Sequence, residues 1–411
     1  MNKRFTKDLI IATAFNEWGK FSFKNMSLSL ITDKLKITKP ALYRYFKNKK
    51  ELLNDMSNYL FNKLIQLAST YFDKIKNLKK EDKKDVILIF IREYFEFFGN
   101  NLYYFLFYIF YLIKDRYFEN KNIIEINDKL TFIFSDFIKQ NNLWIKPEQS
   151  ENLLRYIFST GIFLTIFTIH EDLKKKRILK KLDDDQINNI IRSIDKIITS
   201  GFKSNKKNFE IDFKQIEDLY FMNEISCTRN KIFESIANVV AKNGLWDASI
   251  KKIADDLNMS KSSLYLYFKN KKEMLSDMII KEIEQGNERI QKNISVYYDF
   301  FEKLYCAVIT ISSIFVKDYR MMLVFDWFHY QGFELKVQSK IIKSDPFYIL
   351  LQEAVEKKLI KINPFDIEFV TVYLKMQILK DILLLNLMKK EFNLNDMRFI
   401  FNMFLYGIYK E

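Results

Sequence analysis

Two runs of basic, hydroxyl and aromatic residues recur in this chain, 222 positions apart. They are Thr38–Met56 and Ser260–Met278, and the register holds without a gap back to Ile10 and Ile232. No acidic residue occurs from Thr38 to Lys50 or from Ser260 to Lys272. Lysine ammonium groups and hydroxyls are the side chains that hold nucleic-acid phosphates, so the repeated chemistry points to a polyanion.

Three short helices are expected to position each run. The first has apolar residues at i, i+3, i+4 and i+7, the face of an amphipathic helix. In the two copies these are Ile11, Ala14, Phe15 and Trp18, and Phe233, Ile236, Ala237 and Val240. A second helix follows, then a tight turn, and Thr38 or Ser260 is placed to cap a third helix. Two helices joined by a tight turn form the DNA-reading helix-turn-helix.

The third helix should present one face to DNA and bury the other. Leu42 and Phe46, like Leu264 and Phe268, are spaced to anchor it to the other helices. Small or polar residues on the outer face suit entry into the major groove. The residues predicted to contact DNA are Ser27, Ser29, Lys39, Pro40, Ala41, Tyr43, Arg44, Lys47 and Lys49 in the first copy, and Ser249, Lys251, Lys261, Ser262, Ser263, Tyr265, Lys269 and Lys271 in the second. The alternative is a solvated basic face with half-buried tyrosines.

The order of these residues resembles the N-terminal domain of TetR-family (tetracycline-repressor-like) transcriptional regulators. The resemblance rests on Leu-Tyr-x-Tyr-Phe-Lys-Asn-Lys-Lys-Glu, beginning at Leu42 and at Leu264, behind two fitting helices. It implies N-terminal helices that bind DNA and a larger, variable helical bundle that dimerises and holds a small ligand. The second copy is the better match, because the first has Thr32 where the second keeps the family's small Ala254.

An all-α chain of two tandem units is therefore predicted. Gly (8) and Pro (4) are scarce, which disfavours a sheet protein with many tight turns. The expected domains are 1–56 and 227–279 for DNA binding, 57–202 and 280–411 for the bundles, and a linker at 203–226.

Aromatic residues concentrate in the first bundle, and they have two interpretations. They either pack the core or line a pocket for an apolar or aromatic effector. The candidate pocket residues are Phe98, Tyr104, Phe107 and Tyr108, with Met322, Trp327 and His329 in the second bundle.

A net charge of +14 favours an anionic partner, double-stranded DNA or an acidic membrane surface. The longest apolar run, Leu102–Ile113, is too short to cross a bilayer, so no membrane insertion is expected. Cys227 and Cys306 fit no metal or redox spacing. Gly-rich phosphate loops and metal-spaced clusters are absent from the sequence, so we expect no enzyme activity, metal or cofactor.

The sequence thus predicts a cytoplasmic, ligand-responsive regulator in which two fused subunits pair as a pseudo-dimer within one chain, and the resemblance implies a repressor. Further dimerisation of that chain stays open. One alternative is a ligand- or partner-binding scaffold with only non-specific DNA binding. Another is a basic protein that docks on acidic membrane. Because Pro40/Ser262, Ala41/Ser263 and Arg44/Leu266 differ, a two-headed regulator should read two unlike half-sites.

Overall fold

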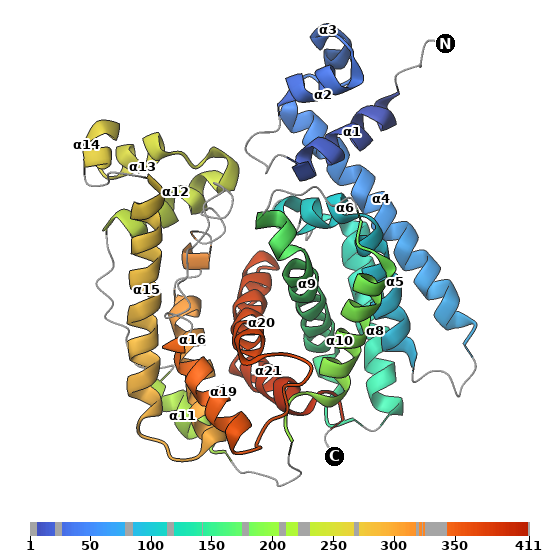
Figure 1. Ribbon diagram of the computed structural model, residues 1–411. Helices are drawn as coiled ribbons and strands as arrows, with labels where there is room; N and C mark the ends of the chain where they lie inside the picture. The colour runs from blue at the N-terminus through green and yellow to red at the C-terminus, as the bar shows by residue number, and fades with distance from the viewer. Residues whose placement is uncertain are drawn as a thin grey trace. The chain divides into compact units, whose positions relative to one another are not determined.

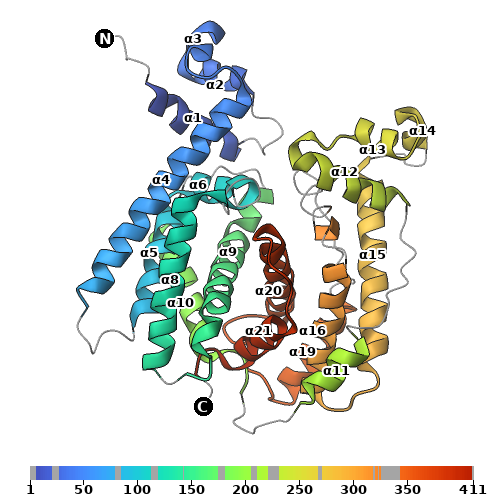
Figure 2. The ribbon, with the colours of Figure 1, turned by 180° about the vertical axis from the view of Figure 1, so that it is seen from behind.

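The chain folds into two helical units, residues 1–199 and 200–411 (Figures 1 and 2). The computed structural model describes all residues except 1–5, 21–26, 79–84, 113–118, 142, 175–180, 205–210, 221–230, 267–270, 318–319, 323, 325–342 and 410–411. Every named element in the described part is a helix, and extended pairing there is limited to an isolated bridge between Lys203 and Ile360. The predicted all-α class with two tandem units is confirmed.

The first unit begins with three short helices and continues into a bundle. Its elements are α1 (Lys7–Lys20), α2 (Leu28–Leu35), α3 (Lys39–Tyr43), α4 (Lys49–Lys76), α5 (Val86–Asn100), α6 (Leu102–Phe107), the π-helix η2 (Tyr108–Leu112), α8 (Lys121–Gln140), the 3-10 turn η4 (Pro147–Gln149), α9 (Ser150–Lys174) and α10 (Asp184–Ser200). We call the part formed by α1–α3 and the start of α4 head 1, and the helices that follow bundle 1. Because α4 is a single helix, it runs from the head into the bundle (Figure 1).

The second unit repeats this plan. Its helices are α11 (Phe213–Tyr220), α12 (Lys231–Asp247), α13 (Ile250–Asp256), α14 (Lys261–Leu266), α15 (Lys271–Ile294), α16 (Phe300–Lys317), α19 (Pro346–Glu356), α20 (Ile367–Leu387) and α21 (Leu394–Tyr406). Head 2 comprises α12–α14 and the start of α15, and bundle 2 comprises the helices after it. The core of bundle 2 is α16, which is buried at nearly every position from Phe300 to Phe315 and packs against α11, α15, α19, α20 and α21.

The apolar run that begins at Leu102 does not form one continuous α-helix. The α-helical hydrogen bonding of α6 ends at Phe107 and gives way to the π-helix η2. Phe105 and Phe107 have no exposed surface, and the ring of Phe98 lies 5.6 Å from that of Phe105 and 5.1 Å from that of Tyr108. Large rings packed edge to face from neighbouring helices fill the centre of bundle 1.

The segment between the two units contains ordered structure that the sequence interpretation treated as linker. Phe202 and Lys203 donate backbone hydrogen bonds to the carbonyls of Phe404 and Leu405 (2.9 and 2.8 Å), and the Phe202 ring stacks on that of Phe404. Further along, α11 packs on α16, with Ile216 fully buried. The described parts of 200–220 therefore belong to the packed structure of the second unit.

One helical stretch, Pro147–His170, is long and apolar enough to cross a membrane by length and composition. Of its most apolar window, 61% is buried. Gly161, within it, lies so close to Phe95 that an added Cβ would overlap the ring, at 1.8 Å from Cζ. Packing of this closeness is what the core helix of a bundle shows.

Candidate nucleic-acid interface

The turn between the second and third helices has the same backbone geometry in both heads. Lys36 and Asn258 adopt left-handed conformations, with φ of 54° and 53°. The next N–H reaches back five residues, from Ile37 to Thr32 O (3.0 Å) and from Met259 to Ala254 O (2.9 Å). These are the hydrogen bonds of a Schellman helix end, which satisfy the last carbonyls and reverse the chain within two residues. The predicted tight turn of a helix-turn-helix is present twice.

A hydroxyl then caps each third helix. Thr38 Oγ1 accepts a hydrogen bond from Ala41 N (3.3 Å), and Ser260 Oγ accepts one from Ser263 N (2.9 Å). The second helices begin in the same way, because Ser27 Oγ accepts from Leu30 N and Ser249 Oγ from Lys252 N, both at 3.3 Å. Capping satisfies amides that would otherwise lack a partner, so these short helices start at defined residues.

The predicted anchors lie inside head 1. Leu42 and Phe46 have no exposed surface, and Lys7 Nζ lies 5.6 Å from the centre of the Phe46 ring while pairing with Asp55 (2.6 Å). Leu264 is likewise buried in head 2. Because this face is buried, the opposite face of α3, and likewise of α14, is the one available to contact a nucleic acid.

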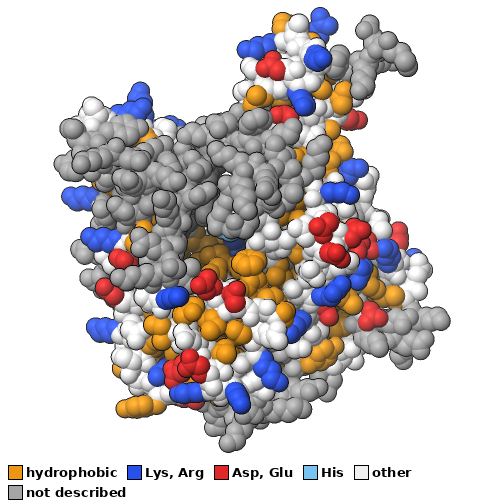
Figure 3. All heavy atoms as spheres, viewed as in Figure 1, with side chains coloured by type: hydrophobic (Ala, Val, Ile, Leu, Met, Phe, Trp, Pro, Cys, Tyr) orange, Lys and Arg blue, Asp and Glu red, His pale blue; other side chains and the backbone are white. Residues whose placement is uncertain are grey.

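The outer face of α3 is largely exposed, and the charged residues on it are basic. Lys39, Pro40, Tyr43 and Arg44 are exposed and Ala41 is half-buried. Blue side chains mark the tip of head 1 in Figure 3. Small residues beside cations permit close approach to a groove and contact with its phosphates.

The start of α4 fixes the loop that follows α3. Asn48 Oδ1 accepts a hydrogen bond from Glu51 N (2.9 Å), and Glu51 Oε2 accepts one from Lys47 N (2.6 Å). Lys47 remains exposed, whereas Lys49 is half-buried and burial lowers the pKa of its ammonium group. Of these two predicted phosphate contacts, Lys47 is the more accessible.

Head 2 presents a different surface in the same frame. Ser249, Lys251, Lys261 and Ser262 are exposed, and Ser263 is half-buried. The Ser260 hydroxyl lies 2.9 Å from that of Ser262 and 2.7 Å from that of Ser263. Of the other predicted contacts, Lys269 lies outside the described residues, as do the side chains of Tyr265 and Lys271. The described outer surface of head 2 therefore offers hydroxyls where head 1 has Pro40 and Ala41.

The profile for bacterial regulatory proteins of the tetR family matches this chain twice, at residues 10–56 and 232–278. Both matches run from the first helix of a head through the capped third helix and into α4 or α15. This chain carries two tandem copies of the tetR-family DNA-binding domain. The resemblance seen in the sequence is thereby confirmed.

One curated protein similar to this chain is a regulator of fatty acid metabolism. The chain is 28% identical over 94 residues to the fatty acid metabolism regulator protein of Bacillus subtilis (strain 168), a match that covers 23% of this chain and 48% of the relative. The chain thus matches about half the length of that curated protein.

Solved structures of two regulators align with this chain at lower sequence identity. The fatty acid degradation regulator FadR from Bacillus halodurans aligns with a TM-score of 0.36 and 17% identity, over 45% of this chain and 98% of FadR. FadR from Bacillus subtilis in complex with stearoyl-CoA aligns with a TM-score of 0.35 and 20% identity, over 44% and 98%.

The residues predicted for an effector pocket pack against neighbouring rings in bundle 1. Phe98 and Phe107 have no exposed surface, Tyr108 is buried, and Tyr104 lies with its ring centre 4.8 Å from that of Phe15. In bundle 2, Met322 is buried, while Trp327 and His329 lie outside the described residues.

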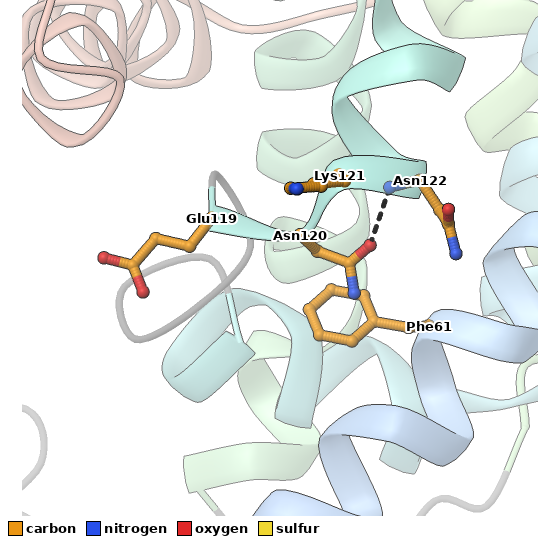
Figure 4. Close-up of a pocket in the computed structure, with 5 residues that line it drawn as sticks. All are labelled: Phe61, Glu119, Asn120, Lys121 and Asn122. Atoms are coloured by element: carbon orange, nitrogen blue, oxygen red, sulfur yellow. Dashed lines mark hydrogen bonds between the residues drawn. The ribbon is translucent and has the colours of Figure 1, made fainter.

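A cavity of about 390 Å³ opens elsewhere in the first unit. It is lined by Phe61 of α4 and by Glu119–Asn122 at the start of α8 (Figure 4). Asn120 Oδ1 caps α8 there, accepting from Asn122 N at 3.1 Å. The sequence interpretation did not single out these polar residues, and a capping Asn before a helix is a signal of helix start rather than of a cavity.

Proposed function

We propose that this protein is a sequence-specific transcriptional regulator that works as an intramolecular pseudo-dimer. The observation that carries the proposal is the presence of two helix-turn-helix heads with the same Schellman turn and capped third helix, each with an exposed polar face. Two heads in one chain can meet successive major grooves, about 34–36 Å apart on one side of the duplex.

The pairing elements would be the last two helices of each unit, α9 with α10 and α20 with α21. Burial extends around α20, because Phe369, Val370, Thr371, Tyr373 and Leu374, which lie within less than two turns, are all buried. The central part of α9, residues 156–169, contains no charged residue. A helix at the edge of a bundle has a polar face, so apolar residues all round favour helices that pack on two sides.

The operator would be asymmetric. Exposed Pro40 and Arg44 of head 1 correspond to Ser262 and Leu266 of head 2. A guanidinium donates two hydrogen bonds to guanine, whereas a leucine can only make apolar contact, so the two heads should favour different bases.

A small apolar effector would change the affinity for DNA by binding one arrangement of the heads better than another. The name of the curated relative, a regulator of fatty acid metabolism, makes a fatty acid the first compound to test. A repressor would lose affinity for its operator when the effector binds.

The test is selection of bound sequences from random duplex DNA by the purified chain at near-physiological salt. We expect one motif with two unlike half-sites about one helical turn apart. A perfect palindrome would mean that two chains each use one head. Absence of enrichment, with binding that disappears as salt rises, would contradict sequence-specific recognition and favour a non-specific scaffold.

A further inference from the structure

The two heads differ in charge at the end of the second helix and in the tight turn that follows it. In head 1, Lys34 lies in the last turn of α2 and Lys36 forms the turn, and both residues are exposed. In the register of the repeat, the same positions of head 2 are Asp256 and Asn258, which are also exposed. Head 1 therefore presents two cations where head 2 presents an anion and a neutral amide.

The cations of head 1 lie beside the start of α3. Lys36 precedes the capping residue Thr38 by two positions, and exposed Lys39 follows it. We call Lys34, Lys36 and Lys39 the turn surface of head 1. In helix-turn-helix proteins the start of the third helix contacts bases while the helix before it crosses the DNA backbone. Cations between these two helices are therefore placed to reach backbone phosphates.

The turn surface carries uncompensated positive charge. Among the residues that the structure describes, no carboxylate forms an ion pair with Lys34, Lys36 or Lys39. The stretches of head 1 outside the described residues, 1–5 and 21–26, contain no acidic residue. Residues 27–46 include four basic residues and one acidic residue, whereas residues 249–268 of head 2 include three and two.

The cations of head 2 occupy the other end of its second helix. Lys251 is exposed at the start of α13, where head 1 has Ser29. Its neighbour Lys252 is half-buried, and its ammonium group donates a hydrogen bond to Asn243 Oδ1 (2.9 Å). The two heads thus share one backbone frame and place their exposed charge at opposite ends of the helix that precedes the third helix.

The backbone at the turn does not favour a lysine. Lys36 has φ of 54° and Asn258 has φ of 53°, in the left-handed region that asparagine and glycine adopt most readily. A cation at a helix end does interact favourably with the helix dipole. The same residue type in the same conformation follows α19 in bundle 2, where Lys358 has φ of 55° and is exposed. Lys358 is therefore a matched control for any role of Lys36 in folding alone.

We propose that the turn surface of head 1 binds the phosphate backbone of DNA, a contact that head 2 makes from the start of α13 instead. The inference rests on the proposed function, in which both heads bind DNA. The heads then hold different phosphates relative to their third helices. Each half of the complex differs in its backbone contacts as well as in the bases that it reads.

The test is binding of the full chain to a mixed-sequence DNA duplex at 50 and 200 mM salt. Lys36→Asn gives head 1 the turn residue of head 2, so the unfolding midpoint should stay at or above that of the wild type. The ratio of the affinities at the two salt concentrations should fall by about 3–4-fold, because one phosphate contact is lost. Lys358→Asn should have the same effect on stability and leave the ratio unchanged.

A second variant keeps the test decisive if Lys36→Asn lowers the unfolding midpoint. Lys34→Gln removes a charge from a residue in ordinary helical conformation, and it should reduce the ratio by a similar factor. An unchanged ratio in the folded variants would overturn the proposal. An equal decrease in Lys358→Asn would also overturn it, because the effect would then follow the net charge of the chain. Weaker binding of Lys36→Asn to vesicles of phosphatidylcholine and phosphatidylglycerol, with DNA binding unchanged, would assign the surface to lipid instead.

The mixed-sequence duplex separates this inference from the proposed function. If selection yields no motif, sequence-specific recognition fails, and the salt dependence still decides whether the turn surface contacts phosphate. If selection yields a motif, single phosphates beside the half-site of head 1 can be replaced by uncharged methylphosphonates. We expect one position at which this replacement makes Lys36→Asn without further effect, and finding no such position would contradict a direct contact.

Discussion

Glu217 and Arg398 form a two-point ion pair in the second unit although 181 residues separate them in the chain. The guanidinium donates from Nε to Oε1 (2.7 Å) and from Nη2 to Oε2 (2.5 Å), and the Tyr305 hydroxyl also donates to Oε1. The Glu217 side chain is only 4% exposed. This network holds α11, which precedes head 2, on α16 and α21 of bundle 2.

Removing the cation should release α11. Arg398→Met leaves the buried Glu217 carboxylate without its charged partner, and we expect a loss of roughly 3 kcal/mol, the lower end of the range for buried pairs because Arg398 is partly exposed. Amide exchange in α11 and α16 measures it. The control is Arg92→Met, which breaks the solvent-exposed pair with Glu96 and should cost about 0.5 kcal/mol or less. Unchanged exchange in α11 would show that the ion pair does not hold this helix.

A side chain at Gly201 should disrupt the start of the second unit. Gly201 has φ of +57°, and an added Cβ would lie 2.5 Å from Leu405 O and 2.6 Å from Gly407 N. Backbone atoms cannot move aside cheaply, so Gly201→Ala should destabilise the unit by about 2 kcal/mol or more. At Gly286, within α15, an added Cβ would have its nearest neighbour, Ile314 Cδ1, at 4.0 Å. Gly286→Ala should therefore stabilise the unit by about 0.5–1 kcal/mol. Thermal unfolding of the two variants should therefore shift in opposite directions.

Strongly alkaline solution should lower the free energy of unfolding of the second unit. Burial raises the pKa of Tyr406 to about 12, and burial with the neighbouring Glu217 carboxylate also raises the pKa of Tyr305. An unfolded tyrosine ionises near pH 10, about two units below the folded Tyr406. The stabilisation is complete below pH 10 and is lost as the pH rises from 10 through 12, because the unfolded chain releases its proton first.

The unfolding midpoint between pH 8 and 12 measures this loss. Tyr406→Phe removes one ionising group and should make the decline less steep, although it also removes the hydrogen bond from Lys203 Nζ to the Tyr406 hydroxyl (3.3 Å). A decline of the same steepness in that variant would mean that other groups control the alkaline transition.

Arg44 should distinguish base reading from phosphate contact. If it binds a base edge, Arg44→Ala weakens one half-site by about 1–3 kcal/mol and relaxes the preference there. If it binds phosphate, affinity falls almost equally for all sequences and the dependence on salt becomes weaker. Binding titrations with selected and scrambled duplexes at two salt concentrations separate these results. Arg92→Ala, on bundle 1 and away from the tip of head 1, is the control and should leave both unchanged.

The heads were predictable from the sequence because their determinants are local. The caps Thr38 and Ser260 and the tight turn at Lys36 act within a few residues of their partners, and the structure has each as expected. Leu42, which its spacing predicts to face the other helices, is buried. The repeat strengthened this interpretation, since two copies satisfy the same rules with different side chains. The domain boundaries and the DNA contacts themselves remain predictions.

Long-range packing decided what local pattern could not. In the polar stretch after Lys203, the helical spacing of Phe213, Ile216 and Leu219 already indicates α11, but only the structure shows that Glu217 of this helix pairs with Arg398 in the last helix of the chain. The apolar run from Leu102 divides into α6 and a π-helix, and hydrophobic periodicity does not distinguish these hydrogen-bonding patterns. Lys49 resembles its exposed neighbours in sequence but is half-buried.

The sequence by itself therefore determined the duplication, which a comparison of its two halves shows directly. It also determined the helical class and the caps and turns of the heads, since these depend on contacts between near neighbours. Only the tertiary structure showed that Phe15 joins head 1 to Tyr104 and Phe107. The exchange of Phe15 for Ala237 is visible in the repeat, but its meaning depends on which rings lie across from that position. The packing of helices that are distant in sequence decides which rings lie there.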